Sequence, residues 1–207
     1  MSLYVQYGCG LCAPDGWVNF DASPTLRLQK IPVLGRFSKV RFPASARFGD
    51  IRLGLPIAPA SADAVYCSHV LEHLALDDLR LALKNTAAIL RPGGVFRLVL
   101  PNLKISAQEY IQSTQPDAAI RFMEATLLGR KTRPRGLSGL LRSWLGNSEH
   151  LWMWDFDSLS MELTKAGFGS IRPAVAGDSG DAMFDKVEDA GRWNGALGIQ
   201  CLRPLSP

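Results

Sequence analysis

The sequence contains few cysteines and no long apolar run, and both absences restrict the class of protein that it can encode. Its 207 residues include 4 cysteines, which without an export signal indicate reduced thiols rather than a disulfide framework. No apolar stretch approaches the ~18–20 residues of a membrane-spanning helix. The first residues, MSLYV, lack a charged region and a long apolar stretch, so no signal peptide is visible. We therefore expect a cytoplasmic protein without a membrane span.

Repeats, low-complexity segments and an extreme composition are also absent. Apolar residues make up 47% of the chain and charged residues 20%, which is ordinary for a globular protein and excludes collagen-like, coiled-coil and globally disordered chains. A domain uses ~100–200 residues. We therefore expect residues 1–207 to form a single domain, large enough to bury a core without disulfides or metal.

Charge is distributed unevenly along a mildly basic chain. The formal net charge is +4 and the isoelectric point is near 9.0, which alone does not indicate nucleic-acid binding. Basic residues gather over 27–52 and 130–142, whereas acidic residues gather over 178–189. The basic stretches are interpreted as solvated loop surface, with attraction of an anionic acceptor or a nucleic acid as the alternative. Their members are Arg27, Lys30, Arg36, Lys39, Arg41, Arg47, Arg52, Arg130, Lys131, Arg133, Arg135 and Arg142.

Apolar patterning predicts strands that alternate with helices. We expect strands over residues 3–7, 17–21, 46–50, 62–68, 95–100, 170–175 and 196–202. Helices are expected over 76–90, after a capping box formed by Ser106 and Glu109, over 117–128, and from a cap at Asp157 to residue 166. Residues 24–46 show no clear period, so we expect an irregular segment with one short helix. This order predicts an α/β domain with a largely parallel sheet.

In such a sheet ligands bind beyond the carboxyl ends of the strands, so the residues that follow each strand form the candidate site. Gly8-Cys9-Gly10 follows the first strand, and Asp21 ends the second only eleven residues after Gly10. A dinucleotide fingerprint places its acidic residue ~20 residues after the glycines. The first crossover is therefore too short for a full helix, which disfavours a pyrophosphate-bearing cofactor. A ribose-bearing cofactor without phosphates fits this spacing better.

Five short sequence blocks give evidence in addition to this spacing. They are YGCG at 7–10, GWVNFD at 16–21, GDI at 49–51, DAVYCSHVLEHL at 63–74 and LRPGGVF at 90–96. In this order they resemble the motifs of the class I S-adenosylmethionine-dependent methyltransferases of the type 11 kind. The resemblance implies a Rossmann-like fold with a shortened first crossover, in which helices flank a twisted, mostly parallel sheet of about six or seven strands. It also implies S-adenosyl-L-methionine as the cofactor.

The resemblance further implies which residues of the first two strand ends would hold that cofactor. The backbone of Tyr7, Gly8, Cys9 and Gly10 would approach its methionine part. The carboxylate of Asp21 would accept hydrogen bonds from the ribose diol.

The next strand ends complete the implied site. Asp50 would accept from the adenine amino group, with Ile51 against the ring, and Ser68 and His69 would line the wall near the sulfonium. Residues of about 1–102 would then form the cofactor-binding core, about 103–157 an acceptor-side insertion, and about 158–207 the C-terminal strands.

The chain departs from the family pattern in three respects. Cys12 stands where the first motif often has a third glycine, and the first helix is nearly absent. The chain begins at its first strand, without the helices that often cover the substrate in this superfamily. These departures leave a catalytically silent or partner-dependent cofactor-binding module as the alternative to an enzyme.

The segment EHLWMWD at 149–155 supplies the candidate catalytic residues. His150 would remove a proton from an acceptor hydroxyl, with Asp155 as the second candidate, and the tryptophans would form an apolar or sugar-stacking wall. Core packing of a connecting segment is the equal alternative. We expect methyl transfer to a small-molecule or glycan hydroxyl; a nucleic-acid acceptor is less favoured, and a homodimer is one open oligomeric state.

Two short motifs suggest metal or redox chemistry but are interpreted otherwise. HVLEH at 69–73 matches the H-x-x-E-H zinc motif, but His69 lies at a strand end, so it need not share a helical face with His73. Cys9 and Cys12 form a C-x-x-C without a second pair, and the short crossover offers no helix to lower a thiol pKa. We therefore expect no metal, buried thiols, and local packing for His73.

Overall fold

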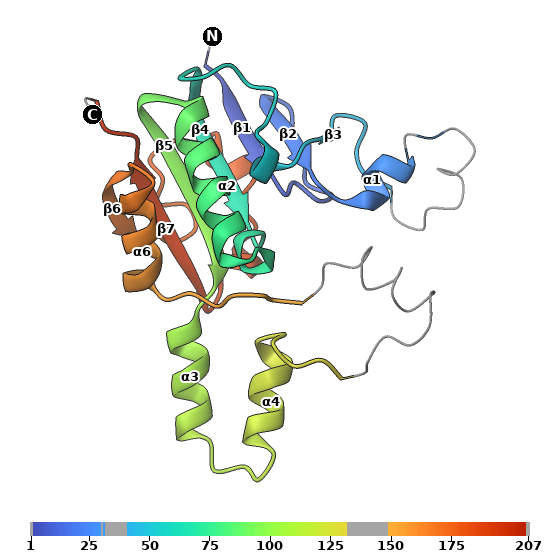
Figure 1. Cartoon of the computed structure of the whole chain (residues 1–207), viewed down its shortest axis with the longest axis vertical. Helices are drawn as coiled ribbons and strands as arrows, with labels where there is room; N and C mark the ends of the chain where they lie inside the picture. Colours follow the sequence, from blue (N-terminus) through green and yellow to red (C-terminus); the bar gives the residue numbers. More distant parts are fainter. Residues whose placement is uncertain (1, 30, 32–40, 132–148, 206–207) are drawn as a thin grey trace.

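Figure 1 shows a computed structural model of the chain, which describes residues 2–29, 31, 41–131 and 149–205. Within these ranges seven strands form one sheet in the order β3-β2-β1-β4-β5-β7-β6. Their bounds are β1 Tyr4–Tyr7, β2 Trp17–Asp21, β3 Arg47–Phe48, β4 Ala62–Ser68, β5 Leu90–Pro101, β6 Gly169–Pro173 and β7 Ala196–Leu202. The first five pair in parallel, whereas β7 is antiparallel to both β5 and β6. The predicted mostly parallel α/β sheet is therefore confirmed.

Helices and short turns connect the strands. The helices are α1 Pro24–Gln29, α2 Leu76–Ile89, α3 Leu103–Gln112, α4 Ala118–Ala125, α6 Phe156–Lys165 and α7 Ala190–Trp193, and the 3-10 turns are η2 Ile51–Leu53, η3 Leu71–His73 and η4 Phe184–Lys186. In Figure 1, α2 and α6 lie on the same face of the sheet, and α3 and α4 project beyond its lower edge. The larger core lies between the sheet and the two helices, where Leu79, Leu83, Leu159 and Leu163 are fully buried.

The connection from β1 to β2 contains no helix. Adjacent parallel strands usually need a dozen or more residues and a helix between them. Here two buried amides hold a short link over residues 8–16: Gln6 Nε2 donates to the Cys12 carbonyl and to Asn19 Oδ1, each at 2.6 Å. Asn19 Nδ2 in turn donates to the Pro14 carbonyl at 3.2 Å. The predicted short crossover is confirmed, and these amides satisfy carbonyls that a helix would otherwise satisfy.

The sheet face opposite α2 and α6 is covered by residues 174–195, which connect β6 to β7. Trp17 and Tyr66 of the sheet pack edge-to-face against Phe184, with ring centroids 5.5 and 6.3 Å apart. The Trp17 indole donates to the Met183 carbonyl at 2.9 Å, and the Trp193 indole donates to the Tyr66 hydroxyl at 3.2 Å. A second, aromatic core therefore closes against the β6–β7 segment.

Two predicted helix caps are wrong. Ser106 and Glu109 lie inside α3, whose cap is Asn102; its Oδ1 accepts a backbone N–H of the first turn at 3.0 Å. Asp157 lies in the first turn of α6, whose cap is Asp155; its Oδ1 accepts the amide of the third residue on at 2.8 Å. In both places an Asn or Asp directly after the preceding extended segment accepts hydrogen bonds from the first backbone amides of the helix. The helix therefore begins earlier than predicted.

The four cysteines form no disulfide; Cys12 is exposed, whereas Cys9, Cys67 and Cys201 are buried. The expectation of buried thiols is therefore wrong for Cys12. Burial raises the pKa of Cys9 to about 12, which argues against a redox role for the C-x-x-C pair.

None of the helices in the described ranges is both long and apolar enough to cross a membrane.

Candidate active site

The turn after β1 lies where the strand order of the sheet reverses. β1 pairs with β2 on one side and with β4 on the other, and ligands of open α/β sheets bind at such a point. Gly8 (φ +69°) and Gly10 (φ +53°) turn the chain here. A Cβ on Gly8 would lie 2.0 Å from a Val70 methyl group, whereas a Cβ on Gly10 would meet nothing within 4 Å. Gly8 is therefore packed beneath Val70, while Gly10 borders open space.

Asp21 at the end of β2 binds directly to this turn. Its Oδ2 accepts the Gly10 amide at 2.9 Å, and its Oδ1 accepts the Ser23 amide at 2.7 Å. Each carboxylate oxygen can accept a further hydrogen bond, so capacity remains for an external donor. The structure thus brings Asp21 and the glycine turn together.

Tyr7 and Cys9 contribute only backbone to this edge. Tyr7 is 2% exposed, and its hydroxyl accepts from Thr86 inside the core at 3.3 Å. The Cys9 side chain packs with Leu26 and Ala46. Both were predicted as backbone contacts, and their side chains point elsewhere.

The end of β3 holds its polar side chain in an ion pair. Asp50 caps η2 and accepts from the Arg52 guanidinium at 2.6 Å. Although burial favours the neutral acid, the hydrogen bonds from Arg52 hold the pKa of Asp50 below its ordinary value. Ile51 is 4% exposed and belongs to the larger core. This end therefore offers less free donor and acceptor capacity than the Asp21 end.

Ser68 and His69 lie at the end of β4. The Ser68 hydroxyl is buried without a hydrogen-bond partner among the described residues. His69 has a left-handed backbone (φ +51°), and its Nε2 lies 2.9 Å from the Arg192 carbonyl. Because a carbonyl only accepts, Nε2 carries the hydrogen. Burial alone would lower the pKa of His69. Contact with Glu72 and with the Arg192 carbonyl outweighs burial and raises this pKa.

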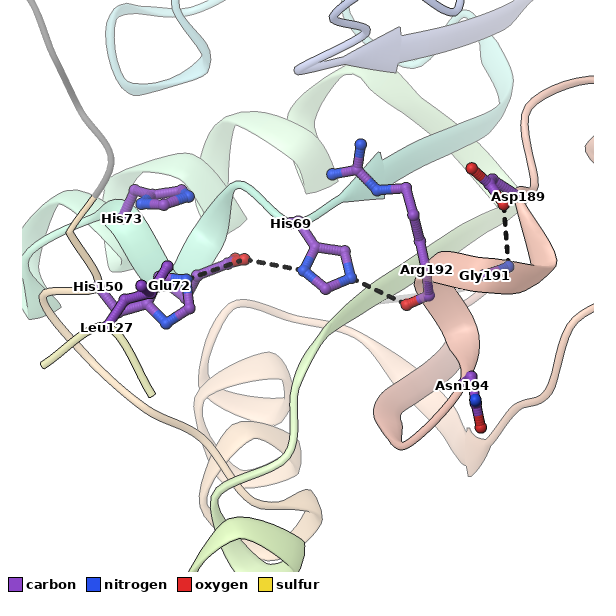
Figure 2. A pocket seen from close by; sticks show the side chains of 9 residues that line it. All are labelled: His69, Glu72, His73, Leu127, His150, Asp189, Gly191, Arg192 and Asn194. Carbon is purple, nitrogen blue, oxygen red and sulfur yellow. Dashed lines mark hydrogen bonds and ion pairs between the residues drawn. The ribbon is translucent and has the colours of Figure 1, made fainter. Parts of the chain in front are cut away.

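The three histidines of the chain surround one buried carboxylate (Figure 2). Glu72 in η3 is fully buried; its Oε1 lies 3.3 Å from His69 Nδ1 and 3.9 Å from His150 Nε2. The His73 and His150 rings stand edge-to-face with centroids 5.0 Å apart. Both carboxylate oxygens of Glu72 and Nδ1 of His150 lack hydrogen-bond partners among the described residues.

His150 reaches this cluster because its segment docks on η3. The Glu72 carbonyl accepts the amides of Leu151 and Trp152 at 2.8 and 3.1 Å, and the His150 amide donates to the Leu127 carbonyl at 3.2 Å. Burial lowers the pKa of His150 below its ordinary value, which favours the neutral form of the ring. His150 was predicted as a site residue from the sequence, whereas Glu72 was not, although it lies within the HVLEH motif.

An open cleft of about 490 Å³ adjoins the cluster and the end of β4. Figure 2 shows His69 between Glu72 on one side and α7 on the other. The Arg192 guanidinium donates to the Ser68 carbonyl at 3.1 Å, which fixes α7 to the strand end. The lining residues are His69, Glu72, His73, Leu127, His150, Asp189, Gly191, Arg192 and Asn194.

Asp155, the other candidate catalytic residue, is committed to structure. Its carboxylate caps α6 through the amide and hydroxyl of Ser158, at 2.8 and 2.5 Å. These hydrogen bonds hold the pKa of Asp155 below its ordinary value. It is absent from the residues that line the cleft.

Three described residues of the two basic stretches are held in ion pairs within the chain. Arg52 pairs with Asp50, and Arg130 pairs with Glu149, both at 2.6 Å. Lys131 pairs with Glu124 at 2.7 Å. Arg27 lies over the Phe48 ring, 3.7 Å from its centroid. The predicted members Lys30, Arg36, Lys39, Arg133, Arg135 and Arg142 lie outside the described residues.

Comparisons with known proteins identify methyltransferases as similar to this chain. A family model described as a methyltransferase domain matches residues 15–98. The curated protein O-methyltransferase resE of Aspergillus sclerotiorum is 37% identical over 90 residues, which are 44% of this chain and 31% of that protein. The chain therefore spans about a third of the length of this curated relative.

Solved structures resemble the whole chain in fold. A methyltransferase solved in complex with the Haloferax volcanii Trm112 methyltransferase activator matches with a TM-score of 0.52 and 17% identity, over 98% of this chain and 83% of that chain. A possible histamine N-methyltransferase from Thermotoga maritima matches with a TM-score of 0.52 and 15% identity, over the same shares. At these identities the likeness concerns the fold, which is Rossmann-like.

Proposed function

We propose that this chain, which matches a methyltransferase-domain model over residues 15–98, is a class I S-adenosylmethionine-dependent methyltransferase that transfers the cofactor's methyl group to a hydroxyl of a small-molecule or glycan acceptor. S-adenosylmethionine is the cofactor that accompanies this family. The observation that carries the proposal is the junction of the Gly10 turn and Asp21 at the switch point of the sheet. An open cleft lined by His69 lies at the end of the neighbouring strand β4.

The residues at this junction fit the cofactor. Gly10 borders open space, Asp21 keeps acceptor capacity for a ribose diol, and the buried Ser68 hydroxyl has no partner among the described residues. The adenine end fits less directly, because Asp50 is held by Arg52 and Ile51 is buried. We therefore propose that the backbone of residues 7–10, Asp21, Ser68 and His69 bind the ribose and methionine parts.

The cleft is the proposed acceptor site. When bound, the cofactor supplies an electrophilic methyl group on its sulfonium. The cleft next to Ser68 and His69 would align the acceptor oxygen for in-line attack. His150, neutral and at the cleft, would help to remove the acceptor proton, and Glu72 beside it would stabilise the resulting positive charge. The O-methyltransferase relative supports a hydroxyl acceptor. Asp155 is the weaker candidate because it caps α6.

Replacement of Asp21 tests the cofactor part of this proposal. We expect the wild type to bind S-adenosylmethionine and its demethylated product in isothermal titration calorimetry. Asp21→Asn should weaken both affinities ~10–100-fold, since a hydrogen bond to a charged group contributes about 1.5–3 kcal/mol. Asp15→Asn, exposed in the same crossover, is the matched control and should bind as the wild type does. Equal affinities of the two variants would contradict the assignment.

Turnover tests the acceptor part. Transfer of labelled methyl groups to a panel of small phenols, alcohols and glycans should proceed with at least one hydroxyl acceptor. His150→Ala should lower the rate while cofactor affinity stays unchanged, because the residue acts on the acceptor side. An undiminished rate in this variant would remove His150 from the reaction.

A partner-dependent subunit is the second candidate. α3 and α4 bury none of their residues in the described structure, and Ile111 and Ile120 are 77% and 63% exposed. Figure 1 shows this helix pair projecting from the body, and the Haloferax neighbour was solved with an activator protein. This candidate predicts cofactor binding without turnover on any acceptor by the chain alone.

A further inference from the structure

We propose that Glu72, His73 and His150 form a binding site for a divalent transition-metal ion of the zinc type, open toward the cleft. Metal binding itself is independent of the methyl-transfer proposal; only the role of the ion toward an acceptor rests on it. The inference departs from the expectation of no metal. It also differs from the H-x-x-E-H interpretation, because His69 is not part of the set.

The three side chains offer a donor set that such ions prefer. One ligand atom from each residue lies within 4.8 Å of the others. Two imidazole nitrogens and one carboxylate oxygen form the set found in open zinc sites, in which ligand atoms about 2.0–2.2 Å from the ion leave a further position free. Ligand atoms in such a site stand ~3.4 Å apart, so small side-chain rotations would close the set.

His73 is held in the tautomer that a metal ligand requires. Its Nδ1 lies 2.9 Å from the Glu149 carbonyl, which can only accept, so Nδ1 carries the hydrogen and Nε2 keeps its lone pair in the neutral ring. Metal-bound histidines are commonly oriented by this contact of the second ring nitrogen. Glu149 is itself fixed by its ion pair with Arg130 at 2.6 Å.

Glu72 supplies the second, independent observation. Its side chain is fully buried, and neither oxygen has a hydrogen-bond partner among the described residues. Buried polar groups are nearly always satisfied, so an unpartnered carboxylate needs an explanation. A bound cation supplies one. His69 is the positioning residue: its Nδ1 lies 3.3 Å from Oε1 of Glu72, while its Nε2 is committed to the Arg192 carbonyl.

The open side of the cluster faces the cleft. Glu72, His73 and His150 all line it together with α7 residues. An ion held here would be accessible to an acceptor oxygen, whose pKa it would lower. His150 would then act as a ligand rather than as the group that takes the proton.

Metal titration of the full chain tests the site without an activity assay. After treatment with a chelator, Zn²⁺ is titrated by calorimetry, and Co²⁺ by its visible absorption. We expect one ion per chain. The visible absorption of bound Co²⁺ should be that of a site with a low coordination number, and no thiolate-to-metal charge-transfer band should be seen. His73→Ala and His150→Ala should each weaken affinity more than ~100-fold, because second-shell changes alone cost ~10–100-fold. His69→Ala removes only the positioning contact, so it should weaken Zn²⁺ affinity by ~10–100-fold.

The C-x-x-C pair provides the matched control. Cys9 and Cys12 are the other zinc-type donors close in sequence, so Cys12→Ser should leave Zn²⁺ affinity unchanged if the histidine site is correct. Failure of the wild type to bind Zn²⁺ or Co²⁺ would overturn the proposal whether or not the variants fold, as would binding that Cys12→Ser abolishes. S-adenosylmethionine affinity, measured in the same samples, separates this outcome from failure of the proposed function.

Discussion

Gly8 and Gly10 share a left-handed backbone but differ in their surroundings. Val70 lies over Gly8, where an added Cβ would approach its methyl group to 2.0 Å, whereas the same atom on Gly10 would enter open space. A left-handed backbone costs an L-residue about 1–2 kcal/mol, so both positions favour glycine. Gly8 serves packing of the turn, and Gly10 leaves room for a ligand.

Alanine substitutions at these two positions should therefore separate stability from binding. Gly8→Ala should lower the free energy of unfolding by about 1–3 kcal/mol through overpacking in addition to the backbone cost. Gly10→Ala should cost only about 1–2 kcal/mol but should weaken S-adenosylmethionine binding, because its methyl group occupies the open space. Urea unfolding and calorimetry measure the two effects. Equal losses of stability would contradict the packing difference.

The candidate site was predictable where neighbours in sequence are neighbours in space. Gly10 and Asp21 meet across two adjacent strands joined by a short link, so their positions at two neighbouring strand ends predicted that they lie together. Glu72, His73 and His150 come together only because residues 150–152 dock on the Glu72 carbonyl. The HVLEH and EHLWMWD motifs were each recognised, but no local pattern indicates that docking.

At the scale of elements, one buried carboxylate ties α6 to α2. Glu162 is 5% exposed, and its carboxylate accepts from Arg80 Nε and Lys165 Nζ, both at 2.8 Å. These two hydrogen-bonded cations lower the pKa of Glu162 to about 2 from its ordinary 4.5. The carboxylate therefore stabilises the fold in its ionised form.

This tie predicts a pH-dependent difference between the wild type and Glu162→Gln. Because the pKa is lower in the folded state, the stabilisation is complete above about pH 4.5 and is lost as the pH falls toward 2. The wild type should unfold at a higher temperature than the variant at pH 7, and the gap should shrink toward pH 2. Asp77→Asn is the control, since the Asp77 carboxylate also touches Arg80 but is 93% exposed. A gap that is constant with pH would refute the assignment.

The bounds of the elements were less predictable than their order. β2, β4 and β7 match their predicted ranges because each is an apolar run in a continuous buried strand. The starts of α3 and α6 were misplaced, because Asn102 and Asp155 cap the helices and not the residues of the predicted motifs. Sequences that look like cap motifs also occur inside helices. Which polar residue caps the helix depends on where the preceding extended segment ends, and the local sequence does not show that.

At the scale of the whole molecule, Arg97 anchors the β6–β7 segment to the sheet. This fully buried residue of β5 contacts Glu188, donates to Asp178 at 2.7 Å and to Gln200 at 3.0 Å, and lies 4.6 Å from the Trp193 ring. The sequence shows only that acidic residues gather over 178–189. Two of them compensate a cation in the core, a contact that charge patterning alone does not show.

Removal of this cation should destabilise the whole molecule. Arg97→Met leaves Glu188, which is nearly buried, without its partner, and breaking a buried ion pair in this way costs about 3–5 kcal/mol. Arg91→Met on the same strand is the control, because Arg91 is half exposed in its ion pair with Asp63 and such pairs contribute about 0–1 kcal/mol. Chemical unfolding curves compare the two variants. Similar losses in the free energy of unfolding would show that the buried Arg97 network stabilises the fold no more than a surface ion pair does.

The β6–β7 cover also has a consequence for the order of folding. Trp17 near the start of the chain completes its packing only against Phe184, and Tyr4 donates to Asp181 at 2.7 Å. The apolar face formed by β1, β2 and β4 therefore stays open during synthesis until the last quarter of the chain has been made. Contacts of such long sequence separation slow folding and leave apolar surface exposed to aggregation. The strands that carry the proposed cofactor site are translated first, but one of their two faces is covered only after the β6–β7 segment has been made.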